Sequence, residues 1–302
     1  MDAVSRPRRG LLTPNLELEP ISELSTFRRL ALGTWRTAYD PSVYGSITLR
    51  MDPALAYIEA FRAATGKHLT ITHLMARAAA AVYERVPDAN VLLRRGRLYR
   101  RRRIGVFFQV AMADPRTGKI DLSGATIHDP ERKSLAEICD ELDTRFAEVR
   151  ADSDGALARV RRMFERLPLR VIPAVLELTA FASYTLNLDL RWAGVPRDAF
   201  GSVMITNIGA LGLEEAYVPL VPYSRVPLLL ALGAIRQTPV ATGGEVRVEH
   251  TMKLCATFDH RVLDGAHAAE MARTLRAWIE DPVAHFDPIP AATEGRARAM
   301  HS

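Results

Sequence analysis

A histidine near the C-terminal end of the sequence lies between a strand-like and a helix-like segment. Residues 246–258 alternate apolar and polar side chains, which predicts a β-strand, and 264–279 has the apolar spacing of a helix. His260 falls between them, and Asp264 and Gly265 follow it closely. An imidazole, with an ordinary pKa of about 6.5, exchanges protons near neutral pH, and at a strand end it can face a cleft. His260 is therefore a candidate general base.

These residues also have ordinary structural explanations. Asp264 is a good N-cap for a helix, and Gly265 permits a tight turn. A histidine at a strand end is usually a polar surface residue. Thr206 ends the predicted strand 200–206, where a threonine is common. The spacing by itself leaves the catalytic and the structural interpretations open.

Several segments resemble the catalytic domain of dihydrolipoyl acyltransferases, which belong to 2-oxo acid dehydrogenase complexes and share the fold of chloramphenicol acetyltransferase. Residues 258–266 read FDHRVLDGA, which contains the HxxxDG signature of both families. Upstream segments that resemble the same domain follow in the right order: LTIT at 69–72, KSLAEI at 133–138, ITNIG at 205–209 and ALGAIRQTPV at 231–240. The resemblance covers roughly residues 22–282.

The expected fold class is α+β, a chloramphenicol acetyltransferase-like two-layer sandwich with helices on a mixed sheet. The mixed order of the predicted elements, without strict β–α alternation, agrees with it. Helices are predicted at about 22–37, 52–65, 70–85, 134–151 and 264–279, and strands at about 43–51, 91–93, 104–112, 119–127, 200–206, 226–235 and 246–258.

The resemblance implies a CoA-dependent acyltransferase that moves an acyl group between CoA and a thiol of the dihydrolipoyl type, or another acceptor. His260 would deprotonate the acceptor. Thr206 stands where the family often has serine, and its hydroxyl would stabilise the tetrahedral oxyanion. Asn207 and Gly209 are expected to bind substrate.

The other expected site residues support the loop that carries the histidine. By analogy with the resembling acetyltransferases, Asp264 would brace this loop by pairing with an arginine near the N-terminus, Arg28 or Arg29. Gly265 would permit the turn. No metal site is predicted.

The resemblance also implies partners. A homotrimer is expected, with each active site between subunits, so that His260 and Thr206 meet across an interface. No covalently bound cofactor is expected, CoA being a substrate. Residues 1–20 are too few for a lipoyl domain, so a lipoyl group would come only in trans, from a lipoyl-domain protein. The alternative is a non-catalytic trimeric scaffold or membrane-surface adaptor.

The predicted organisation is a flexible tail over 1–20 and a single catalytic domain over 21–302, with an enlarged segment at about 155–197. This segment opens with a basic helix, and the apolar run 171–186 follows. The run could pack in the core or a subunit contact, line an acyl pocket, or lie on a membrane surface through 155–190.

A second basic feature is the arginine run 94–103. A solvated hairpin is the simplest interpretation, and CoA phosphates or anionic lipid are functional ones. Nucleic acid is not expected, because only Tyr99 interleaves with the arginines.

Composition excludes several classes of protein. Two cysteines far apart make neither a disulfide framework nor a zinc site. No apolar stretch approaches the ~20 residues of a membrane-spanning helix. No secretory signal or nucleotide-phosphate loop is present. The expected location is the cytoplasm or, through 155–190, the periphery of a membrane.

Overall fold

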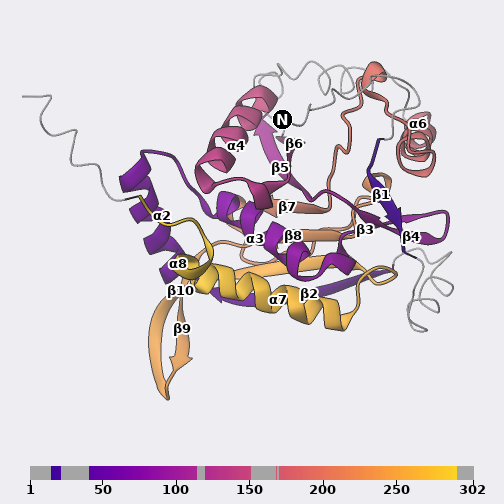
Figure 1. Ribbon diagram of the computed structural model, residues 1–302. Coiled ribbons are helices and arrows are strands. Elements are labelled where there is room, and N and C mark those ends of the chain that lie inside the picture. Colours follow the sequence, from indigo (N-terminus) through magenta and orange to yellow (C-terminus); the bar gives the residue numbers. More distant parts are fainter. Residues whose placement is uncertain (1–14, 22–40, 114–119, 151–167, 169, 291–302) are drawn as a thin grey trace, which may run out of the picture.

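A computed structural model describes residues 15–21, 41–113, 120–150, 168 and 170–290. Its centre is a seven-stranded sheet with the order β2-β10-β8-β7-β5-β6, and β9 pairs with β10 (Figure 1). The strand β7 runs parallel to β5 and β8, whereas the other pairs are antiparallel. The strands are Ser42–Arg50 (β2), Gly105–Ala113 (β5), Ile120–His128 (β6), Val203–Asn207 (β7), Leu228–Leu232 (β8), Arg236–Thr242 (β9) and Glu245–Asp259 (β10). The sheet is therefore mixed, as predicted.

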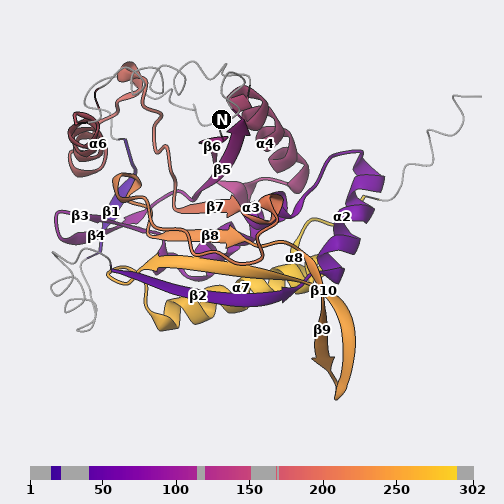
Figure 2. The same ribbon diagram turned by 180° about the vertical axis from the view of Figure 1, so that it is seen from behind.

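The strand β10 extends past the body of the molecule. Its first half pairs with β9 alone, and the two form a ribbon that projects away from the helices (Figures 1 and 2). The turn between β9 and β10 is Gly243–Gly244, both with positive φ, a conformation that glycine adopts without steric cost. Val246 and Val248 on this ribbon are 74% and 69% exposed.

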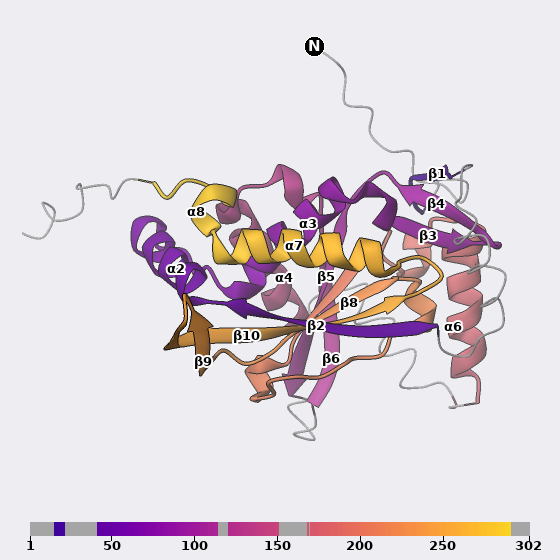
Figure 3. The same ribbon diagram turned by 90° about the horizontal axis from the view of Figure 1, so that it is seen from below.

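Helices cover one face of the sheet. They are Asp52–Thr65 (α2), Ile71–Arg85 (α3), Leu135–Arg150 (α4) and Gly265–Glu280 (α7), and the short Pro282–His285 (α8) follows α7. The helix α3 packs between α7 and α4, and its alanines are buried there (Figure 3). The predicted helices at these positions are confirmed, whereas the one predicted at 22–37 lies outside the described residues.

The opposite face of the sheet is covered by the irregular segment 214–224. Val218 and Leu220 pack against Phe107, Met204 and Leu229 on the strands. The result is the predicted α+β sandwich of helices on a mixed sheet.

A second, smaller sheet joins β1 (Leu18–Pro20), β4 (Arg97–Arg101) and β3 (Val91–Arg94). The predicted tail over 1–20 is therefore wrong for residues 15–20, because Leu18–Pro20 pair with β4 and Leu16 is buried. Residues 1–14 lie outside the described residues.

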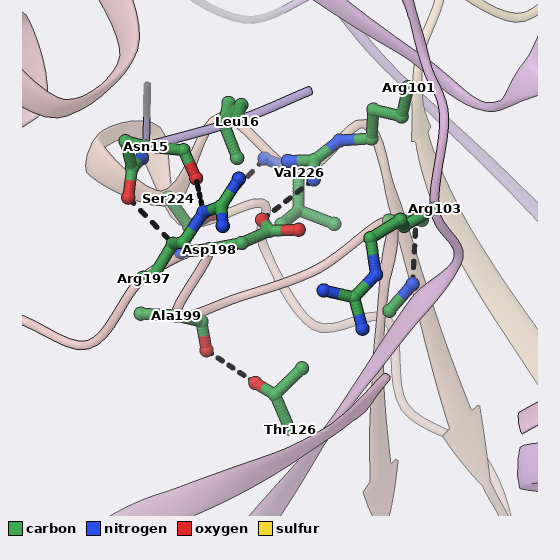
Figure 4. Close-up of polar contacts among 12 residues, drawn as sticks. Asn15, Leu16, Arg101, Arg103, Thr126, Arg197, Asp198, Ala199, Ser224 and Val226 are labelled. Carbon is green, nitrogen blue, oxygen red and sulfur yellow. Dashed lines mark hydrogen bonds and ion pairs between the residues drawn. The ribbon is translucent and has the colours of Figure 1, made fainter. Parts of the chain in front are cut away.

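The arginine run forms the hairpin β3–β4, but it is not uniformly solvated. The side chain of Arg101 is only 3% exposed and forms an ion pair with Asp198 at 2.7 Å. Asn15 holds this region together, since its Oδ1 accepts from the Asp198 N–H and its carbonyl oxygen accepts from Arg197 Nε (Figure 4).

The described part of the enlarged segment contains α6 (Ile172–Ala180) and a π-helical turn, Phe181–Thr185. The basic helix predicted before it lies outside the described residues. None of the described helices is both long enough and apolar enough to cross a membrane.

A histidine at the start of α3 should make the stability of the fold depend on pH. His73 Nδ1 accepts from the Thr70 N–H at 3.0 Å and lies 2.6 Å from Thr70 Oγ1, and burial lowers the pKa of His73 to about 4. The folded state thus takes up a proton less readily than the unfolded chain, whose histidine pKa is about 6.5. The stability that the neutral His73 contributes is fully present above pH 6.5 and is lost as the pH falls toward 4. Lowering the pH from 7 to 4.5 should therefore remove about 2–3 kcal/mol of the free energy of unfolding.

Urea unfolding at both pH values, compared with His73→Gln, measures this contribution. Glutamine can still accept from the Thr70 N–H as in a capping box, but does not titrate. An equal loss of stability in both proteins would contradict the prediction.

Candidate active site

His260 lies directly after β10, in a turn that the surrounding residues fix. Its N–H donates to the carbonyl oxygen of Pro41, next to β2, at 2.9 Å. The carbonyl oxygen of Asp259 accepts from the N–H groups of Val262 and Leu263, both of which are buried. This turn holds the backbone of His260 between the sheet and α7.

One hydrogen bond determines which ring nitrogen of His260 can act as a base. His260 Nδ1 lies 2.9 Å from the carbonyl oxygen of Leu263. A carbonyl oxygen only accepts, so Nδ1 carries the proton and Nε2 is the nitrogen with a lone pair. The orientation of the ring and its tautomer are thus set by the chain itself.

Asp264 is the N-cap of α7. Its Oδ1 accepts from the N–H groups of Ala266 and His267 at 3.0 and 3.1 Å, and lies 2.6 Å from His267 Nδ1. These contacts fit a residue that braces the loop and are those of a strong helix cap. His267, whose contact with this carboxylate the sequence did not predict, follows three residues later on the same turn of helix.

Of the remaining residues predicted to support the loop, the structure describes only Gly265. Arg28 and Arg29 lie outside the described residues. Gly265 has no positive φ, and a Cβ atom built on it would meet nothing within 4 Å. No steric need for glycine at position 265 is therefore visible within the chain, and its role in permitting the turn stays a prediction.

Thr206 lies far from His260 in the same chain. Its partner on β8 is Ala231, whose partner on β10 is Cys255. His260, just past the end of β10, is five residues further along the chain than Cys255, or about 16 Å at the usual rise per residue of a strand. Because β10 runs opposite to β7 and β8, the two side chains lie toward opposite ends of the sheet.

Asn207 and Gly209, the predicted substrate-binding residues, line a hollow of about 420 Å³. Asn207 Oδ1 accepts from the Ala210 N–H at 3.0 Å. A Cβ atom on Gly209 would lie 2.5 Å from the carbonyl oxygen of Gly233, and one on Gly233 would lie 2.1 Å from that of Glu214. Only glycine fits at these close approaches, so part of this hollow is bare main chain.

Two other lining residues were not predicted. Ile71 at the start of α3 and Arg236 at the start of β9 border the same hollow. Both fall in segments that carried the resemblance, which was the only sequence signal for them. Arg236 places a cation at the rim, and Glu214 lies 3.4 Å from its Nε.

Comparison with known proteins finds similarity to acyltransferases. Residues 198–286 match the family model of the 2-oxoacid dehydrogenases acyltransferase (catalytic domain). The chain is 38% identical to the dihydrolipoyllysine-residue acetyltransferase component of the acetoin cleaving system of Bacillus subtilis (strain 168) over 80 residues. This aligned segment is 26% of this chain and 20% of that protein. Over 54 residues the chain is 43% identical to the succinyltransferase component of the mitochondrial 2-oxoglutarate dehydrogenase complex of Mus musculus, 18% of this chain and 12% of that protein. The matches thus span a fifth or less of these longer relatives.

Solved structures share the fold over most of the chain. A probable dihydrolipoamide acetyltransferase from Listeria monocytogenes superposes with a TM-score of 0.60 at 15% identity, over 91% of this chain and 99% of that one. The cubic core of a pyruvate dehydrogenase multienzyme complex superposes with a TM-score of 0.61 at 20% identity, over 87% of this chain and 93% of that one. The dihydrolipoamide acetyltransferase of Azotobacter vinelandii gives 0.60 at 19% identity, also over 87% and 93%. The chain thus has the fold of these catalytic cores, and it resembles the catalytic domain of the 2-oxoacid dehydrogenase acyltransferases.

Proposed function

We propose that this chain is a CoA-dependent acyltransferase with His260 as its general base. The observation that carries the proposal is the hydrogen bond from Nδ1 to the Leu263 carbonyl oxygen, which leaves Nε2 as the ring nitrogen that can accept a proton. In the Azotobacter vinelandii protein, a serine, a histidine and an asparagine four residues after the histidine were investigated for their part in the catalytic mechanism. His260 and Asp264 have the same spacing.

The proposed reaction needs no redox change. Nε2 of His260 takes the proton of the acceptor thiol, and the thiolate attacks the carbonyl carbon of the acyl-CoA thioester. The Thr206 hydroxyl donates to the resulting oxyanion. When the intermediate collapses, the carbon–sulfur bond to CoA breaks, and the imidazolium returns its proton to the CoA thiolate.

The site must then be assembled from two copies of the chain. The separation of about 16 Å along β10 is too large for Thr206 and His260 of one chain to act on one carbonyl group. The projecting ribbon β9–β10 supports an assembly as well, since two strands alone are marginally stable in water and two valines on it are exposed. We propose a homotrimer with the sites between subunits, in which Asn207 and Gly209 contact substrate.

Replacing Thr206 by valine should lower kcat by about 10²-fold, because the oxyanion loses its hydroxyl donor while the side chain keeps its shape. Acyl transfer from acetyl-CoA measures this. Mixed assemblies of Thr206→Val and His260→Ala chains should be more active than either variant alone, since some sites then combine an intact histidine with an intact threonine. No gain on mixing would contradict a site shared between copies.

The nature of the acceptor is tested with the same assay. Acetyl-CoA and longer acyl-CoAs are offered to dihydrolipoamide and to simple monothiols, and the acylated product is measured. A preference for dihydrolipoamide would support a dihydrolipoyl-type acceptor, which a lipoyl-domain protein would have to supply in trans. Absence of transfer to any thiol would overturn the proposed function.

A further inference from the structure

The helix α6 exposes an apolar face. Val171, Leu178 and Phe181 recur at helical spacing and are 41%, 68% and 47% exposed. We call these three residues the α6 face. Ala180 and Tyr184, on the buried side of the segment, pack against Leu16 and Leu92. The segment is thus anchored to the small sheet on one side and presents large apolar side chains to solvent on the other.

Exposed arginines lie on the neighbouring hairpin β3–β4 and just before α6. Arg95 and Arg97 at the tip of the hairpin β3–β4, Arg102 after it and Arg170 before α6 are exposed. Among the described residues, no carboxylate lies within ion-pair distance of these four. By contrast, Arg100 and Arg103 pair with Asp88 and Asp129. The hairpin therefore carries exposed arginines that form no ion pair with a described carboxylate.

The hairpin and the helix form one end of the molecule. Arg94 Nε donates to the carbonyl oxygen of Thr185 at 2.7 Å, which ties the tip of the hairpin to the end of the α6 segment. Figures 1 and 3 show α6 and the hairpin next to each other, at the end opposite to α2 and the ribbon. A hollow of about 300 Å³ between β1, the hairpin and the segment after α6 is bordered by Arg94, Tyr99 and Arg102.

We propose that this end of the molecule docks on an anionic membrane surface. The α6 face would enter the boundary between headgroups and acyl chains, and the arginines would contact lipid phosphates, the two interactions that hold interfacial helices on membranes. At nine residues, α6 is too short to span a bilayer but can lie on one. Charge favours this occupant over a second copy packed face to face, which would bring the same exposed arginines together.

Co-sedimentation of the full chain with vesicles tests the proposal. Binding is expected to vesicles that contain phosphatidylglycerol and to be at least about tenfold weaker with phosphatidylcholine alone or in high salt. Leu178→Asp combined with Phe181→Asp, and separately Arg95→Glu combined with Arg97→Glu, should each weaken binding by about tenfold or more. All four positions are exposed, so the fold should persist, which circular dichroism verifies.

The matched control is Val283→Asp on α8, whose valine is 77% exposed at the other end of the molecule. It should bind vesicles as the wild type does. The His260→Ala variant should also bind unchanged, so the outcome is independent of acyl transfer. No binding to either vesicle would overturn the proposal, as would binding that neither pair of substitutions lowers. If the wild type does not bind vesicles and light scattering shows a smaller assembly for the Leu178→Asp/Phe181→Asp variant than for the wild type, the α6 face instead joins copies of the chain.

Discussion

Replacing His260 by alanine is expected to lower the rate of acyl transfer by about 10³-fold. A correctly placed base contributes roughly 10²–10⁴-fold, and the contact of Nδ1 with the Leu263 carbonyl oxygen leaves Nε2 of His260 to act as that base. The side chain is only partly buried, so its loss should leave the fold and the assembly intact. Steady-state turnover with acetyl-CoA and dihydrolipoamide measures the effect, and light scattering checks the assembly.

His68→Ala is the matched control, because His68 is an exposed histidine just before α3. Turnover of this variant should equal that of the wild type. Wild-type turnover by His260→Ala in an intact assembly would remove the histidine from the mechanism.

The substitution Asp198→Asn is expected to cost about 3 kcal/mol of the free energy of unfolding. Asp198 forms an ion pair with Arg101, and the side chains of Asp198 and Arg101 are 14% and 3% exposed. Without the carboxylate, a guanidinium would remain buried in the hairpin without its counter-charge, which is the costly way to break a buried pair. Chemical denaturation of the two proteins measures the difference.

A neighbouring pair provides the control. Arg100 on the same hairpin and Asp88, which lies just before it, meet at 2.6 Å, but their side chains are 45% and 66% exposed. Asp88→Asn removes the same kind of group from a solvated pair and should cost less than about 1 kcal/mol. Equal losses in Asp88→Asn and Asp198→Asn would show that burial of Arg101 does not determine the cost.

The elements that could be predicted from the sequence are those with local signals at their ends. The helix α2 begins with Asp52-Pro53 and ends at Gly66 in the left-handed conformation, and α7 begins after the capping Asp264. The strand β1 had no such signal. Its residues alternate with charges, and its partner, β4, lies some eighty residues away in the chain. Pairing over that distance is decided by tertiary structure, which short patterns do not encode.

The candidate site was predictable to a similar degree. The position of His260 at a strand end and of Asp264 at a helix start follow from spacing. The opposite placement of Thr206 and His260 follows from the strand order β10-β8-β7, which no segment of sequence reveals by itself. Likewise, the run of arginines gave no indication of which one would be buried, because Asp198 lies 97 residues from Arg101.

The close approach of Gly209 to Gly233 limits how the hollow beside Asn207 can be redesigned. Any side chain at either glycine would collide with main-chain atoms, so the shape of this part of the wall is fixed by the course of the backbone. Redesign of this proposed substrate-binding hollow therefore has to begin at bordering side chains such as Ile71 and Arg236. A library that randomises these two positions and keeps both glycines would sample new selectivities while it preserves the framework.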